Sequence, residues 1–116
     1  MAKITITDLC VRTIIGTNGW ERENLQDILI NIVFSYDSRK AAKSDNIKDA
    51  VDYKKITKQI IREVELSHYF LLEALVEHVL KIVMAHPAVA EAMVRIDKPH
   101  ALRFAKSVAL ELHRKR

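Results

Sequence analysis

The chain has 116 residues, of which 49% are hydrophobic and 29% charged, and this composition predicts one globular domain, residues 1–116, with a core of its own. No apolar run approaches the roughly 20 residues of a transmembrane helix, which argues against a membrane partner. The formal net charge is +4, but Lys and Arg alternate with Asp and Glu along most of the chain, so the sequence also argues against nucleic-acid binding.

Two long strands are expected first. Residues 4–15 read ITITDLCVRTII, and their apolar positions change parity near Thr7 and Asp8, so we predict a strand with a β-bulge at that point. After a loop bracketed by glycines, residues 26–36 alternate strictly and predict a second strand, paired with the first in the antiparallel sense. One face of this second strand carries Ile28, Ile30, Ile32, Phe34 and Tyr36.

Two helices are expected after a polar stretch at residues 37–50, because apolar residues then recur every three or four positions. The first helix is predicted to begin near Asp52, a plausible cap. The second is predicted to begin near Ser67 or His68 and to end before Pro87. The positions expected to face the core are Ile56, Ile60, Ile61, Val64, Leu72, Leu75, Val76, Val79, Leu80 and Val83.

Alternation returns at residues 90–96, stops at Pro99 and resumes at residues 108–112, which predicts two more strands. The order β-β-α-α-β-β favours an α+β fold in which both helices cover one face of a four-stranded antiparallel sheet. The opposite face is expected to present Leu29, Val33, Val89 and Met93. A partly apolar face and two open edges promote association, so we predict a symmetric homo-oligomer.

The sequence lacks the general signatures of cofactor and catalytic sites. It contains no GxGxxG, Walker or GxSxG motif, and its five histidines show no HxH or HxxxH spacing, so neither a metal site nor a cofactor is predicted. The single Cys10 cannot form an internal disulfide, and no secretory leader is apparent, so we expect a cytoplasmic protein.

One lysine occupies a distinctive position. Lys98 directly precedes Pro99 at the end of a predicted strand, where stiff backbone can hold a reacting group. A lysine at a strand end is more often an idle, solvated residue. The pattern by itself leaves both interpretations open.

Several stretches, in one order from about residue 3 to residue 113, resemble the dihydroneopterin aldolase family and the related dihydroneopterin triphosphate 2′-epimerases. They are RTIIG, NGWERENLQD, KSDNIKDAVDY, FLLEAL and IDKPHALRFAKSV. The resemblance implies the tunnelling fold, whose element order agrees with the one predicted above. It also implies a ring of four subunits, commonly stacked in pairs as an octamer, with active sites between neighbouring subunits.

The resemblance implies roles for individual residues. Lys98 matches the family's catalytic lysine, and Glu73 matches the glutamate that accepts hydrogen bonds from the 2-amino group and N3 of a pterin. Without the resemblance, Glu73 would be assigned to an ordinary solvated helix face. Tyr53 matches a catalytic tyrosine that reaches the substrate in the adjacent subunit, whereas its residue type alone favours a half-buried aromatic at the start of a helix.

The acidic loop offers two glutamates, Glu21 and Glu23. Gln26 matches the glutamine at the start of the family's second strand, and counting back from it selects Glu21 as the residue that positions Lys98. Further substrate contacts are implied at Leu72 and Asp52.

The activity implied by the resemblance is that of a dihydroneopterin aldolase of folate biosynthesis, with C2′ epimerisation alongside it. The alternative is a dihydroneopterin triphosphate 2′-epimerase, which uses the same bond cleavage. His100 stands where many aldolases have glycine, and His100, Arg103 and Lys106 are candidate contacts for a triphosphate. A third hypothesis is a non-catalytic basic binding module, whose binding to nucleic acid would weaken steeply with salt.

Overall fold

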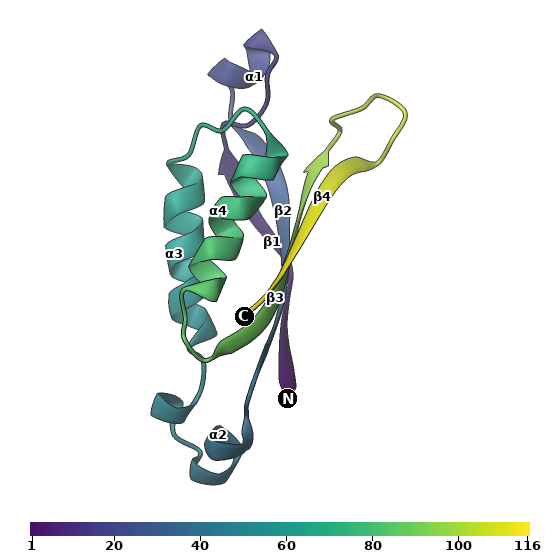
Figure 1. Ribbon diagram of the computed structural model, residues 1–116. Helices are drawn as coiled ribbons and strands as arrows, with labels where there is room; N and C mark the ends of the chain where they lie inside the picture. Colours follow the sequence, from purple (N-terminus) through teal and green to yellow (C-terminus); the bar gives the residue numbers. More distant parts are fainter.

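The computed structural model describes residues 1–116, and its centre is one antiparallel sheet covered on one face by two helices (Figure 1). The sheet contains β1 (Ala2–Thr13), β2 (Gln26–Tyr36), β3 (Val89–Pro99) and β4 (Ser107–Lys115), in that order. The covering helices are α3 (Tyr53–Glu65) and α4 (Leu72–Met84). The predicted β-β-α-α-β-β order and the tunnelling fold are therefore confirmed.

The core lies between the sheet and the two long helices, and the apolar periodicity explains it. On β2, four alternate side chains point toward the helices and are fully buried, namely Ile28, Ile30, Ile32 and Phe34. The inward stripes of α3 and α4 meet them, with Ile60 and Leu80 among the residues that lose all exposure to solvent. The predicted core is therefore confirmed at its centre, whereas Ile61, Leu72 and Tyr36 are only partly buried.

The predicted bulge in β1 is confirmed. The register between β1 and β2 shifts between Ile6 and Leu9, and Asp8 has a positive φ of 53°. The amide of Asp8 donates to Asn31 Oδ1 at 2.9 Å, which gives the bulged backbone a partner on the neighbouring strand. The bulge explains why Ile4 and Val11, on opposite parities, both face the helices.

Three short helices lie in segments that the sequence predicted as loop or polar stretch. They are α1 (Gly19–Glu23), α2 (Arg39–Ser44) and the 3₁₀ turn η1 (Ile47–Asp49). Each is too short to show an apolar period, so periodicity could not reveal it. No helix is both long and apolar enough to span a membrane.

The boundaries of the long helices are partly as predicted. Asp52 caps α3, since its carboxylate accepts hydrogen bonds from the amides of Lys54 and Lys55 at 3.1 and 3.2 Å. The predicted start of the second helix near Ser67 is wrong, because α4 begins at Leu72. The Ser67 hydroxyl and carbonyl are instead within hydrogen-bond distance of the Thr13 hydroxyl at the end of β1.

One predicted surface residue lies in the core. Val89 was expected on the uncovered face of the sheet, but it has no exposure to solvent. Ser35 pairs with Glu91 and Tyr36 with Val89, so Ala90 is an extra residue on β3, and this bulge turns the Val89 side chain inward. Leu29, Val33 and Met93 remain on the uncovered face, where they line a cavity with polar neighbours.

Candidate active site

Lys98 lies near the end of β3 and forms a largely buried ion pair. Its Nζ atom donates to Oε2 of Glu21 at 2.7 Å, and only 13% and 7% of the two side chains are exposed. The pair joins residues 77 positions apart in the sequence. Lys98 is therefore not a solvated surface lysine, and the choice of Glu21 over Glu23 agrees with this contact.

The Glu21 carboxylate is held from three sides. Besides Lys98, the Gln26 side chain donates to Oε2 at 3.0 Å and the Asn18 amide donates to Oε1 at 3.2 Å. A β-carbon at Gly16 would lie 2.2 to 2.3 Å from the same carboxylate, and Gly16 has a φ of +128°. Glycine at this position therefore lets the carboxylate pack directly against the backbone.

These contacts set the charge state of Glu21. Burial raises the pKa of its carboxyl, but hydrogen bonds from Lys98, Gln26 and Asn18 outweigh that effect, so the pKa lies below the ordinary value of 4.5. Glu21 is therefore ionised at neutral pH, and the ammonium of Lys98 has a fixed anionic partner.

The lowered pKa of Glu21 predicts a pH-dependent stability. A carboxyl group of this kind stabilises the folded state above its unfolded pKa of 4.5, and this contribution is lost as the pH falls through the folded value. Glu21→Gln should therefore destabilise the protein at pH 7 and flatten the loss of stability below about pH 4.5. Urea unfolding of both proteins at a series of pH values measures this, with the exposed Glu65→Gln as control. If the free energy of unfolding changed with pH in the same way for Glu21→Gln and the native chain, the prediction would be contradicted.

An arginine that sequence reasoning missed ties α1 to the segment before α4. Arg22 donates through Nη1 to the carbonyls of Gly16 and Tyr69, at 3.1 and 2.9 Å, and through Nη2 to the carbonyl of His68 at 2.6 Å. Its guanidinium also stacks 3.9 Å from the centroid of the Phe70 ring. No sequence pattern reveals such a residue, because two of its three acceptors are backbone carbonyls more than 40 positions away.

This connection places the first turn of α4 at the same end of the molecule as the ion pair, where α1 also lies in Figure 1. Glu73 is exposed in that turn, and Leu72 beside it is partly buried. The structure thus brings Glu21, Glu73 and Lys98 to one end of the sheet and the helices. At this end the Glu73 side chain is exposed, whereas the Lys98 ammonium is shielded from solvent in its ion pair.

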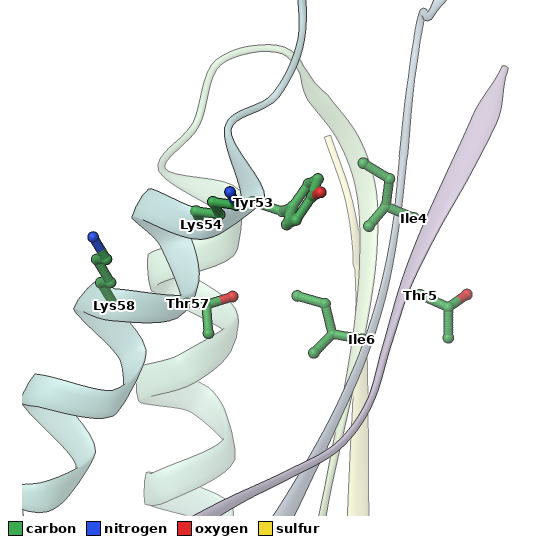
Figure 2. Close-up of a pocket in the computed structure, with 7 residues that line it drawn as sticks. All are labelled: Ile4, Thr5, Ile6, Tyr53, Lys54, Thr57 and Lys58. Atoms are coloured by element: carbon green, nitrogen blue, oxygen red, sulfur yellow. The ribbon is translucent and has the colours of Figure 1, made fainter. Parts of the chain in front are cut away.

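Tyr53 lies elsewhere, at the first turn of α3, where 49% of it is exposed. Figure 2 shows its ring pointing into a cavity of about 590 Å³ between α3 and β1, across from Ile4. Through the sheet register, Ile4 pairs with Phe34 and Phe34 with Ala92, about six residues before Lys98. At about 3.3 Å per residue, Tyr53 and Lys98 are roughly 20 Å apart along the strands. One chain therefore does not join them in one site.

The loop between β3 and β4 carries the other predicted polar residues. His100 has a φ of 63°, and its amide donates to the carbonyl of Lys106 at 3.3 Å. Both residues line a cavity of about 660 Å³ with Asp97, on the face of the sheet opposite the helices. Successive strand residues point to opposite faces, so Asp97 and Lys98 diverge, and in one chain His100 and Lys106 do not join Lys98. No set of three or more His, Cys, Asp or Glu side chains is grouped so as to hold a metal ion.

Comparison with known proteins gives one consistent result. The family model described as dihydroneopterin aldolase matches residues 4–113. The chain is 46% identical over 112 residues to the dihydroneopterin triphosphate 2′-epimerase of Pseudomonas aeruginosa, a match that spans 97% of this chain and 91% of that one. It is 31% identical over 111 residues to the dihydroneopterin aldolase of Escherichia coli, and this match spans 96% of this chain and 91% of that one. The crystal structure of E. coli dihydroneopterin aldolase in complex with neopterin superimposes with a TM-score of 0.93 at 31% identity, over 98% of this chain and 99% of that one.

Proposed function

Because the chain belongs to the dihydroneopterin aldolase family, we propose that residues 1–116 form one domain that cleaves the C1′–C2′ bond of 7,8-dihydroneopterin. The products are 6-hydroxymethyl-7,8-dihydropterin and glycolaldehyde, as in folate biosynthesis. The observation that carries the proposal is the shielded ion pair of Lys98 and Glu21 at a strand end, beside the first turn of α4 that bears Glu73.

The substrate supplies its own acceptor for electrons. Removing the proton of the C2′ hydroxyl lets the C1′–C2′ electron pair form a C6=C1′ double bond. N5 takes up a proton as the imine becomes an enamine, and C2′ leaves as an aldehyde. Protonation at C1′ and loss of the N5 proton then restore the imine. The proposed reaction therefore requires neither a metal ion nor a lysine Schiff base as electron sink.

The protein's share of this reaction is orientation and proton transfer. Glu73 binds the 2-amino group and N3 of the pterin in two parallel hydrogen bonds, and Leu72 and Asp52 complete the substrate contacts. Lys98 and Tyr53 exchange protons with N5 and the side-chain hydroxyls, and Glu21 positions Lys98. A positioned acid or base typically contributes a factor of about 100 to 10,000 in rate.

The separation of Tyr53 from Lys98 supports active sites between subunits. β1 and β4 are both edge strands, and pairing of these edges between copies would close the sheet into a ring. We propose a cytoplasmic homo-oligomer, with four subunits in a ring and two rings in an octamer, in which Tyr53 of one chain meets Lys98 of its neighbour. Sedimentation of the purified protein measures the number of subunits, and a monomer that retains full activity would contradict this assembly.

The identity values favour a second candidate function. The chain is 46% identical to a dihydroneopterin triphosphate 2′-epimerase but 31% identical to a dihydroneopterin aldolase. Epimerisation begins with the same cleavage, after which the aldehyde adds back through its other face and inverts C2′. The same catalytic residues serve both outcomes, so the outcomes differ in substrate and in retention of the aldehyde.

Product analysis tests both functions. The protein is incubated separately with 7,8-dihydroneopterin and with its triphosphate, and the pterins are separated by chromatography. Release of glycolaldehyde identifies the aldolase, and inversion of the triphosphate without cleavage identifies the epimerase. No turnover of either compound, together with salt-sensitive binding to nucleic acid, would instead identify a binding module.

Glu73→Ala should weaken pterin binding. Because Glu73 is exposed, its two hydrogen bonds together are expected to contribute about 1.5 to 3 kcal/mol, so the dissociation constant for dihydroneopterin should rise by about 10- to 150-fold. Fluorescence titration of the pterin measures this constant. Glu65→Ala, which changes an exposed glutamate on α3, is the control. Unchanged affinity in Glu73→Ala would contradict the proposed orientation of the ring.

A further inference from the structure

The cavity beside Tyr53 contains more polar groups than a contact for one hydroxyl requires. It is lined by Ile4, Thr5, Ile6, Tyr53, Lys54, Thr57 and Lys58. In Figure 2 the Tyr53 ring and Thr57 point across it toward β1, while Lys54 lies next to Tyr53 and Lys58 lies one helical turn further along α3. The lining thus combines two ammonium groups with hydroxyls, and it includes no carboxylate.

The two ammonium groups have no anionic partner in the chain. Neither Lys54 nor Lys58 takes part in a side-chain hydrogen bond or an ion pair, whereas Arg12, Arg95 and Arg114 each pair with a carboxylate. The nearby Asp52 carboxylate accepts instead from backbone amides. Surface lysines without an anionic partner are common, so the missing partner alone indicates nothing. The proposal depends instead on the location of both lysines beside the cavity that Tyr53 lines.

The chemistry of the relatives' substrate gives that position a meaning. A dihydroneopterin triphosphate 2′-epimerase acts at C2′, which lies between the pterin ring and the carbon that bears the phosphates. A tyrosine that contacts the side-chain hydroxyls therefore marks the point beyond which the phosphates extend. Lysine ammonium groups on flexible stems are suited to follow a phosphate chain there.

We propose that the Tyr53 cavity is the triphosphate subsite of this protein, with Lys54 and Lys58 as its cations and Thr57 as a hydroxyl donor. The proposal rests on the proposed function and adds the substrate class to it. It also distinguishes these lysines from His100 and Lys106, which line the opposite face of the sheet. The free pterin alcohol has nothing to contact at Lys54 and Lys58, so the subsite acts only on phosphorylated substrate.

The double variant Lys54→Met/Lys58→Met tests the subsite. Each lost charge-assisted hydrogen bond should weaken binding by about tenfold, so KM for the triphosphate should rise by about 100-fold, with a weaker dependence on salt than in the native chain. KM and kcat for dihydroneopterin should remain within about twofold, and this unchanged activity also shows that the variant folds. Steady-state kinetics on the two substrates measures both effects.

Two further double variants serve as controls. Lys55→Met/Lys81→Met removes the same charge from α3 and α4 away from the cavity, and it should leave KM for the triphosphate nearly unchanged. Arg103→Met/Lys106→Met removes two cations from the loop between β3 and β4, and it should also leave KM for the triphosphate nearly unchanged. An equal effect of Lys54→Met/Lys58→Met on both substrates, no effect on either, or a loss confined to the loop variant would overturn the proposal. If the native protein turns over dihydroneopterin but not the triphosphate, the subsite proposal fails and the proposed aldolase function stands. If it turns over neither compound, the proposed function fails as well.

Discussion

Replacement of Lys98 by methionine is expected to lower kcat for dihydroneopterin by about 100- to 10,000-fold, the range typical for loss of a positioned acid or base. Methionine retains most of the length of the side chain but cannot carry a proton. Because Glu73 rather than Lys98 is proposed to hold the pterin ring, the dissociation constant for the pterin should change far less than kcat. Stopped-flow kinetics and fluorescence titration measure the two quantities separately.

The substitution also leaves Glu21 without its cation. A buried carboxylate that loses its partner destabilises the fold, so Lys98→Met alone should unfold at lower urea concentration than the native chain. Adding Glu21→Gln removes the unpaired charge and should restore part of the stability without restoring activity. Lys81→Met, on the exposed side of α4, is the control and should change neither the stability nor the activity. Full turnover in Lys98→Met would remove the basis of the proposed mechanism.

Gly16→Ala is also expected to cause a large loss of activity, although Gly16 touches no substrate. Its new β-carbon would lie 2.2 Å from the Glu21 carboxyl carbon, and the φ of +128° is rarely adopted by alanine. The carboxylate must therefore move, and Lys98 loses the 2.7 Å contact that holds it. Because a misplacement of about 1 Å can cost a factor of about 100, we expect a decrease of that order in kcat/KM.

Gly19→Ala is the matched control for this effect. Gly19 lies three residues further along the chain, at the start of α1, but a β-carbon there meets nothing within 4 Å. The activity of Gly19→Ala should therefore remain close to that of the native chain. Because Gly16 acts through Glu21 and Lys98, Gly16→Ala should also shift the pH profile of kcat/KM, whereas mere loss of folded protein would lower the profile without moving it. Native kinetics in Gly16→Ala would show that the position of Glu21 is not critical.

The limits of sequence reasoning are visible in particular residues. The stripe of Ile28, Ile30, Ile32 and Phe34 identified β2 and its buried face, because burial on one side of a strand imposes a period of two. Val89 was placed on the wrong face, because a bulge with one extra residue on β3, Ala90, reversed its orientation. Ala90 and Ala92 are both small and apolar, so the apolar alternation extends through the bulge and the sequence does not reveal it.

By itself, the sequence determined the element order, the helix-covered sheet, the Asp52 cap and the family, because periodicity, capping and motif order are local properties of the chain. The resemblance implied that Glu21 positions Lys98, and the structure gives their 2.7 Å contact. Only the tertiary structure decided that Gly16 makes room for that contact, that Arg22 joins α1 to the start of α4, and that Tyr53 lies at the far end of the sheet. These relations connect residues distant in sequence, and they depend on how the sheet register and the helix ends place backbone groups in space.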